Sequence, residues 1–110
     1  MEKIIVYSTF GDKTNCDKII TTLLEKRLIA CANCFPIESR YWWKDKIESS
    51  NEIAAILKTT NDKWDELCVV IKALHNYENP AIVRIEIKAV KDYDEWIGDE
   101  ISNPNYLSTK

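Results

Sequence analysis

The stretch 28–60 constrains the fold more than any other, because it has the pattern of one long β-hairpin. Two runs rich in apolar, aromatic and β-branched residues flank a short polar turn at Lys44 and Asp45, a composition typical of half-buried strands. Closing the turn there pairs Trp42 with Ile47. Each arm of about 13 residues spans roughly 40 Å, whereas a compact chain of this length is only about 34 Å across. We therefore expect the hairpin to be about as long as its own domain.

The tip of this hairpin carries aromatic side chains that one copy of the chain cannot bury. Tyr41, Trp42 and Trp43 lie next to the turn, and Phe35 lies further along the same arm. Exposed apolar patches of this kind usually mark interfaces between proteins. We therefore expect a homo-oligomer in which these four residues lie at the subunit interface.

Pro36 lies inside the first arm of the hairpin. Proline cannot donate a hydrogen bond to a neighbouring strand, so it is confined to edge strands and bulges. We expect the arm to bend or break there, leaving strand pieces near 28–35 and 38–43.

The segments around the hairpin supply two more strands and three helices. A strand is expected over 3–9, and apolar residues at 16, 19, 20, 23 and 24 predict an amphipathic helix. A second helix follows Thr60 or Asn61, a last strand covers 81–87, and a short helix begins near Asp92. The order β-α-β-β-α-β with an appended helix is the ferredoxin-like split βαβ pattern of α+β proteins. It places both main helices on one face of an antiparallel sheet and leaves the other face for subunit contacts.

Length and composition limit the classes of protein to which the chain can belong. The 110 residues suit one domain (1–110), with its core in 3–101 and a loose tail at 102–110. A net charge of −3 argues against nucleic acid and anionic membranes as partners. No apolar run is long enough to span a membrane and the N-terminus does not resemble a secretory signal, so we expect a cytoplasmic protein. With two glycines, the chain cannot build a glycine-rich phosphate loop.

The four cysteines are interpreted as structural thiols of a reducing compartment. Cys31 and Cys34 are separated by an odd number of positions, so on one regular strand they point to opposite faces. Cys16 and Cys68 lie on the apolar faces of the two main helices, where free cysteine behaves as a small hydrophobe. No zinc-finger spacing is present.

His75, the single histidine, lies in a turn-rich loop with Tyr77 and Glu78. One interpretation is a polar loop residue that hydrogen-bonds a neighbouring backbone. The other is one ligand of a weak metal or small-molecule site, completed by Glu78 or by another subunit. No arrangement of a nucleophile with a base is recognisable, so a non-enzymatic protein is expected.

The chain resembles the CutA divalent-cation tolerance family. The residues that carry the likeness are LIACAN (28–33), Pro36, SRYWW (39–43), KIE (46–48), Glu52, LKT (57–59), HNYENP (75–80) and YDEWI (93–97). The resemblance implies a ferredoxin-like subunit in an intertwined homotrimer whose long hairpins clasp neighbouring subunits. It also implies a role in tolerance to divalent metals such as copper. The copper site of bacterial members uses a cysteine and two adjacent histidines, and the matching positions here hold Ser8, Leu74 and His75.

Three hypotheses follow for function. The first is a trimeric protein of metal-ion homeostasis that binds Cu2+ or another divalent ion weakly near His75 and Glu78, with Tyr77 and Ser8 lining a cleft between subunits. No certain cofactor is expected. The second is a trimeric sensor of a small metabolite, similar in architecture to PII signalling proteins. The third is a structural scaffold without a ligand.

Overall fold

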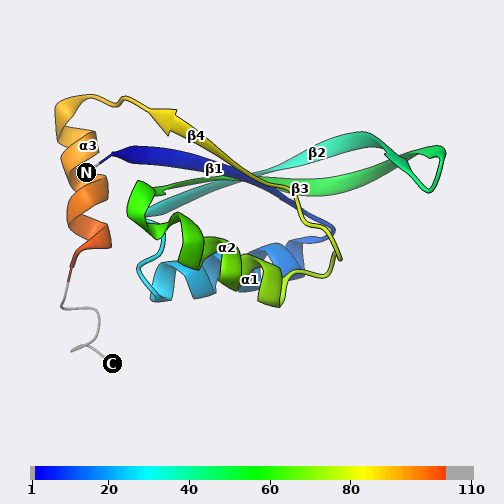
Figure 1. The fold of residues 1–110 in the computed structure, drawn as a ribbon, viewed down its shortest axis with the longest axis horizontal. Helices are drawn as coiled ribbons and strands as arrows, with labels where there is room; N and C mark the ends of the chain where they lie inside the picture. The colour runs from blue at the N-terminus through cyan, green and yellow to red at the C-terminus, as the bar shows by residue number, and fades with distance from the viewer. Residues whose placement is uncertain (1, 104–110) are drawn as a thin grey trace.

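The computed structural model describes residues 2–103, and in that range the chain forms one antiparallel sheet and three α-helices (Figure 1). The elements are β1 (Lys3–Phe10), α1 (Lys13–Glu25), β2 (Cys31–Trp43), β3 (Lys46–Thr60), a 3-10 turn (Asn61–Lys63), α2 (Trp64–Leu74), β4 (Ile82–Ile87) and α3 (Lys91–Ile101). The strand order is β2-β3-β1-β4. The predicted α+β class and split βαβ arrangement are confirmed. The loose tail predicted for 102–110 falls largely on residues 104–110, which lie outside the described residues.

The core lies between the sheet and helices α1 and α2, which cover the same face (Figure 1). Ile4, Val6 and Phe10 alternate along β1 and are fully buried against the helices, as the two-residue period of a strand requires. Asp12 caps the N-terminus of helix α1, and its carboxylate accepts a 2.7 Å hydrogen bond from the backbone N–H of Asn15.

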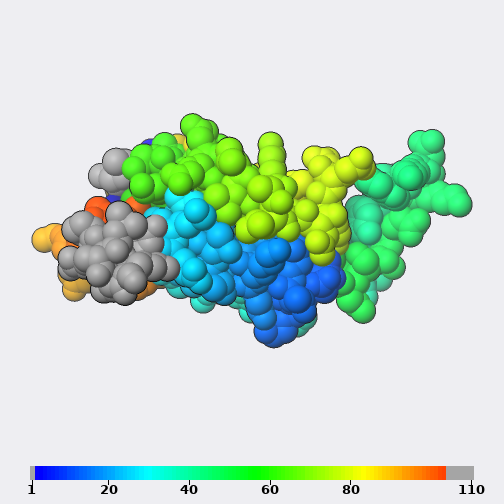
Figure 2. All heavy atoms as spheres, turned by 90° about the horizontal axis from the view of Figure 1, so that it is seen from below, coloured from blue at the N-terminus to red at the C-terminus, as the bar shows by residue number. Residues whose placement is uncertain are grey.

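The hairpin of β2 and β3 has the predicted turn and register. Lys44 and Asp45 both have positive φ angles, 49° and 65°, so the two-residue turn has the twist that joins antiparallel strands. Pairing runs from Trp43 opposite Lys46 to Cys31 opposite Lys58. The hairpin sets the longest dimension of the molecule, 47 Å, and its tip extends beyond the body of the protein (Figure 2).

The break predicted at Pro36 is wrong: β2 is continuous from Cys31 to Trp43, and Pro36 faces Ile53 without a bulge. Two facts explain this. β2 is the edge strand of the sheet. Pairs that exchange hydrogen bonds alternate with pairs that do not, and counting from Trp43 beside the turn places Pro36 at a position whose nitrogen points away from β3. The strand therefore loses no hydrogen bond to the proline.

The sheet face opposite α1 and α2 carries exposed apolar side chains, as predicted. Val83 and Ile85 of β4 are each 49% exposed, next to Tyr7 and Ile5 of β1 in the register. Phe35 belongs to the same face, since it pairs with Ala54. Helix α3 lies at one end of the molecule, away from the hairpin tip (Figure 1), so it leaves much of this face open.

Candidate functional site

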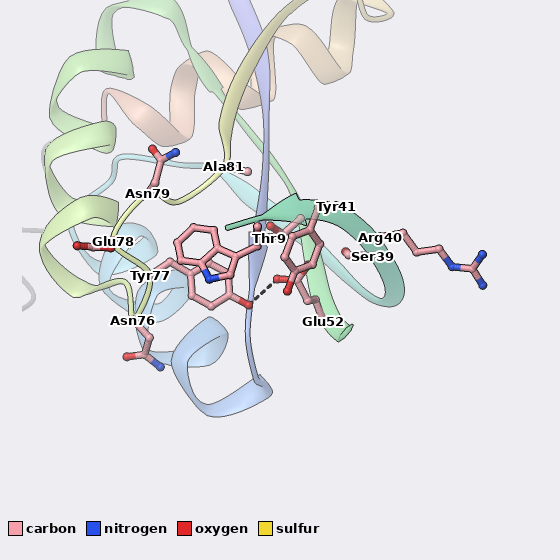
Figure 3. A pocket seen from close by; sticks show the side chains of 11 residues that line it. Thr9, Ser39, Arg40, Tyr41, Glu52, Asn76, Tyr77, Glu78, Asn79 and Ala81 are labelled. Carbon is pink, nitrogen blue, oxygen red and sulfur yellow. Dashed lines mark hydrogen bonds between the residues drawn. The ribbon is translucent and has the colours of Figure 1, made fainter. Parts of the chain in front are cut away.

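A cavity of about 760 Å³ lies where the outer half of the hairpin, toward its turn, meets the loop after α2 (Figure 3). Its lining combines aromatic rings, acidic groups and amides. The lining residues are Thr9, Ser39, Arg40, Tyr41, Trp43, Glu52, Asn76, Tyr77, Glu78, Asn79 and Ala81. Three segments distant in sequence therefore build one concave surface: the end of β1, the hairpin, and the loop that leads to β4.

The wall of this cavity contains a buried carboxylate held by a tyrosine. Glu52 is only 8% exposed, and the Tyr77 hydroxyl donates a 2.6 Å hydrogen bond to its Oε2 (Figure 3). Burial, followed by the hydrogen bond to Glu52 and the charge of that carboxylate, raises the pKa of Tyr77 well above its ordinary value of 10. Tyr77 therefore remains a neutral donor at physiological pH.

Gly11 makes room for this tyrosine. A Cβ atom added at Gly11 would lie 3.0 Å from the Tyr77 hydroxyl oxygen and 3.2 Å from the Cε1 atom of its ring. Contacts as short as these force the neighbouring group to move. The absence of a side chain at Gly11 thus permits the Tyr77–Glu52 contact.

His75 does not line the cavity but contacts Thr9 and Tyr77, which do, and both of its ring nitrogens take part in hydrogen bonds. Its Nε2 is 2.8 Å from the carbonyl oxygen of Thr9, and its Nδ1 accepts a 3.0 Å hydrogen bond from the backbone N–H of Tyr77. The neutral tautomer with the proton on Nε2 satisfies both contacts. The ring stacks on Phe10 and contacts the ring of Tyr77. A metal ion at His75 would have to displace one of these hydrogen bonds, so the geometry favours the interpretation as a loop-ordering residue.

The structure places only some of the other predicted ligand residues at the cavity. Tyr77 and Glu78 line the cavity. Ser8 does not: it is fully buried on the helix-covered face, and its hydroxyl donates a 2.7 Å hydrogen bond to the Ala81 carbonyl. Within residues 2–103, no three His, Cys, Asp or Glu side chains form a group that could hold a metal ion.

The predicted interface residues are exposed in the single chain. Trp42 is 72% exposed, and Trp43, Tyr41 and Phe35 are also exposed. Tyr41 and Trp43 additionally line the cavity, which the sequence analysis did not anticipate. Glu52 was not predicted as a site residue, although an acidic residue in the apolar second arm of the hairpin was a usable indication.

Comparison with known proteins identifies the family. The model of one protein family, described as "CutA1 divalent ion tolerance protein", matches residues 4–100. The chain belongs to this family. The divalent-cation tolerance protein CutA of Pyrococcus horikoshii is 50% identical over 98 residues, which make up 88% of this chain and 96% of that protein.

A solved relative has the same fold. The structure of a CutA protein from Archaeoglobus fulgidus, described as a periplasmic divalent cation tolerance protein, superimposes with a TM-score of 0.89 at 38% identity. The match covers 91% of this chain and 99% of that one. A rice relative named as chloroplastic is 34% identical over 96 residues, 86% of this chain and 54% of that protein. These relatives are assigned to different compartments, and the cytoplasmic location stays a prediction. No helix in residues 2–103 has the length and apolarity needed to cross a membrane.

Proposed function

We propose that this CutA family member contributes to tolerance of divalent cations as a homotrimer, by weak ion binding and without catalysis. The observation that carries the proposal is the family match over residues 4–100, together with relatives named for divalent-cation tolerance. The exposed aromatic hairpin and the open apolar sheet face support the trimer, because surfaces of this kind are stable in water mainly when another subunit covers them.

The cavity is the proposed place for the ion. Glu52 and Glu78, which carry carboxylates, and Asn76 and Asn79, which carry amides, are among the residues that line it. Oxygen-rich sites with few charged ligands bind divalent ions weakly, since affinity rises with the number of charged ligands. His75 joins such a site only by giving up its contact with Thr9 or with Tyr77.

Two measurements test this proposal. Native mass spectrometry with and without added Cu2+ and Zn2+ is expected to show three chains and a partial, concentration-dependent mass increase from bound ion. Glu78→Gln should reduce ion uptake, whereas Glu86→Gln, an exposed residue on β4 outside the cavity lining, should not. A monomer would contradict the trimer, and equal uptake by both variants would contradict the placement of the ion.

The cellular role is tested by growth in toxic copper or zinc. Cells that lack their own CutA protein should recover growth when they express this chain. Unchanged sensitivity at equal expression would contradict the role in cation tolerance.

One observation favours a metabolite sensor as a second candidate. A volume of about 760 Å³ is within the roughly 300–1,000 Å³ of small-molecule pockets, which are typically lined by aromatic groups and a few polar ones. A compound that binds the native state should raise the melting temperature, and Tyr41→Ala should remove that shift. A screen of metabolites without any shift would leave the scaffold hypothesis.

A further inference from the structure

Two of the four cysteines meet between α1 and β2. The Sγ atoms of Cys16 and Cys34 are 4.0 Å apart, although the residues lie 18 positions apart in the chain. The predicted opposite orientation of Cys31 and Cys34 explains why Cys34, and not Cys31, lies next to Cys16. Cys31 is directed toward Asn33 and Lys58, whereas Cys34 faces the helix side of the sheet and reaches Cys16. Both thiols are free.

This separation suits two sulfurs that share one metal ion. A thiolate bond to a metal such as zinc is about 2.3 Å long, so two thiolates on one ion are at most about 4.6 Å apart. The 4.0 Å between Cys16 and Cys34 lies within that limit. An ion could therefore bridge the two side chains without a movement of α1 or β2.

The number of available ligands indicates which kind of metal ion this pair of cysteines could bind. Zinc in structural sites takes four ligands, and in residues 2–103 no third His, Cys, Asp or Glu joins this pair in a metal-binding group. Soft monovalent Cu(I) prefers thiolates and is stable with only two of them. We propose that Cys16 and Cys34 form a two-thiolate site for Cu(I), distinct from the cavity between the outer half of the hairpin and the loop after α2.

The two cysteines differ in exposure: Cys34 is accessible to an ion from solvent, and Cys16 is surrounded by apolar side chains. Cys34 is exposed on the edge strand, while Cys16 is 1% exposed and belongs to the hydrophobic core. Binding converts two thiols and Cu(I) into an anionic bis-thiolate complex and releases two protons to water, so no oxidant or reductant is consumed. Lys13 and Asp17 are the charged neighbours of Cys16, and because they pair with each other at 2.6 Å, they place no net charge beside the complex.

The test is a competition for Cu(I) under anaerobic conditions. The full chain, reduced beforehand and freed of thiol reagents, is titrated with Cu(I) held by a coloured Cu(I) chelator, with ascorbate keeping the copper reduced. The wild-type protein should withdraw one Cu(I) per chain. Cys34→Ser should weaken that binding at least 100-fold, and because Cys34 is exposed this variant should keep its fold.

Matched controls come from the other two cysteines. Cys31→Ser and Cys68→Ser should bind Cu(I) like the wild type, and Cys16→Ala should lose binding like Cys34→Ser. The proposal is overturned if the wild type cannot compete with the chelator, or if Cys34→Ser binds as tightly as Cys31→Ser. Because the readout is Cu(I) per chain, failure here leaves the divalent-ion uptake and growth tests of the proposed function unaffected.

Discussion

Replacement of Tyr77 by phenylalanine removes one hydroxyl from the wall of the cavity and leaves the ring in place. The hydroxyl donates the 2.6 Å hydrogen bond to Glu52, which is 8% exposed. A hydrogen bond to a charged group contributes about 1.5–3 kcal/mol, and its loss leaves the buried carboxylate short of a donor. Since Tyr77 itself is 38% exposed, water can replace part of the contact. We expect a loss of about 1–2 kcal/mol in the free energy of unfolding.

The assay is equilibrium unfolding in guanidinium chloride at one fixed protein concentration. With an m-value of about 4 kcal/mol/M, the midpoint should fall by roughly 0.25–0.5 M. Tyr41→Phe is the matched control, because it also removes a tyrosine hydroxyl but breaks only a 3.3 Å contact with Ser50 at an exposed position. Its midpoint should change little. Equal midpoints for the two variants would refute the reasoning about Glu52.

The same contact predicts a dependence on pH. The pKa of Tyr77 is raised in the folded protein, so the folded state retains this proton after the unfolded state has lost it. The stabilisation is fully present below the unfolded pKa of about 10 and is lost as the pH rises above it. The difference in stability between wild type and Tyr77→Phe should therefore shrink above about pH 10. A difference that stays constant between pH 8 and pH 11 would contradict this linkage.

Three further substitutions test other parts of the fold. Thr59→Val keeps the shape of a buried side chain but leaves the Leu28 carbonyl without its 2.7 Å hydrogen bond, so unfolding should become easier by about 1–3 kcal/mol in denaturant titrations. Asp45→Gly places glycine at a φ of 65° in the hairpin turn and should raise stability by about 0.5–1 kcal/mol, seen as a higher melting temperature. Trp42→Ala should weaken assembly of the proposed trimer in light scattering, whereas Val69→Ala, 67% exposed on α2, should assemble like the wild type.

The hairpin was predictable because its pattern is local. A two-residue turn fixes the register of both arms, so identifying Lys44 and Asp45 as the turn was sufficient to place Cys31 opposite Lys58. The break expected at Pro36 was wrong because its occurrence depends on a non-local fact. Whether a proline disrupts a strand is decided by which strand lies at the edge of the sheet and by which side each N–H faces.

The site was predicted only in part for a related reason. Tyr77 and Glu78 were found because they share a turn-rich loop with the single histidine. Glu52 comes from another segment, and the burial that makes it notable arises only when the loop folds over the hairpin. Ser8 was placed by resemblance, and the strand alternation that buries it facing the helices could have excluded it from an open cleft.

Pro36 also opposes aggregation of this protein through the exposed edge of β2. An exposed edge strand is a template onto which another chain can add, one hydrogen bond after another, as in amyloid. The outer edge of β2 lacks a donor at Pro36, which divides its 13 residues into two shorter rows. A foreign strand would have to begin pairing afresh on the far side of the proline. The residue that costs the native hairpin nothing thus makes uncontrolled growth from its edge less favourable.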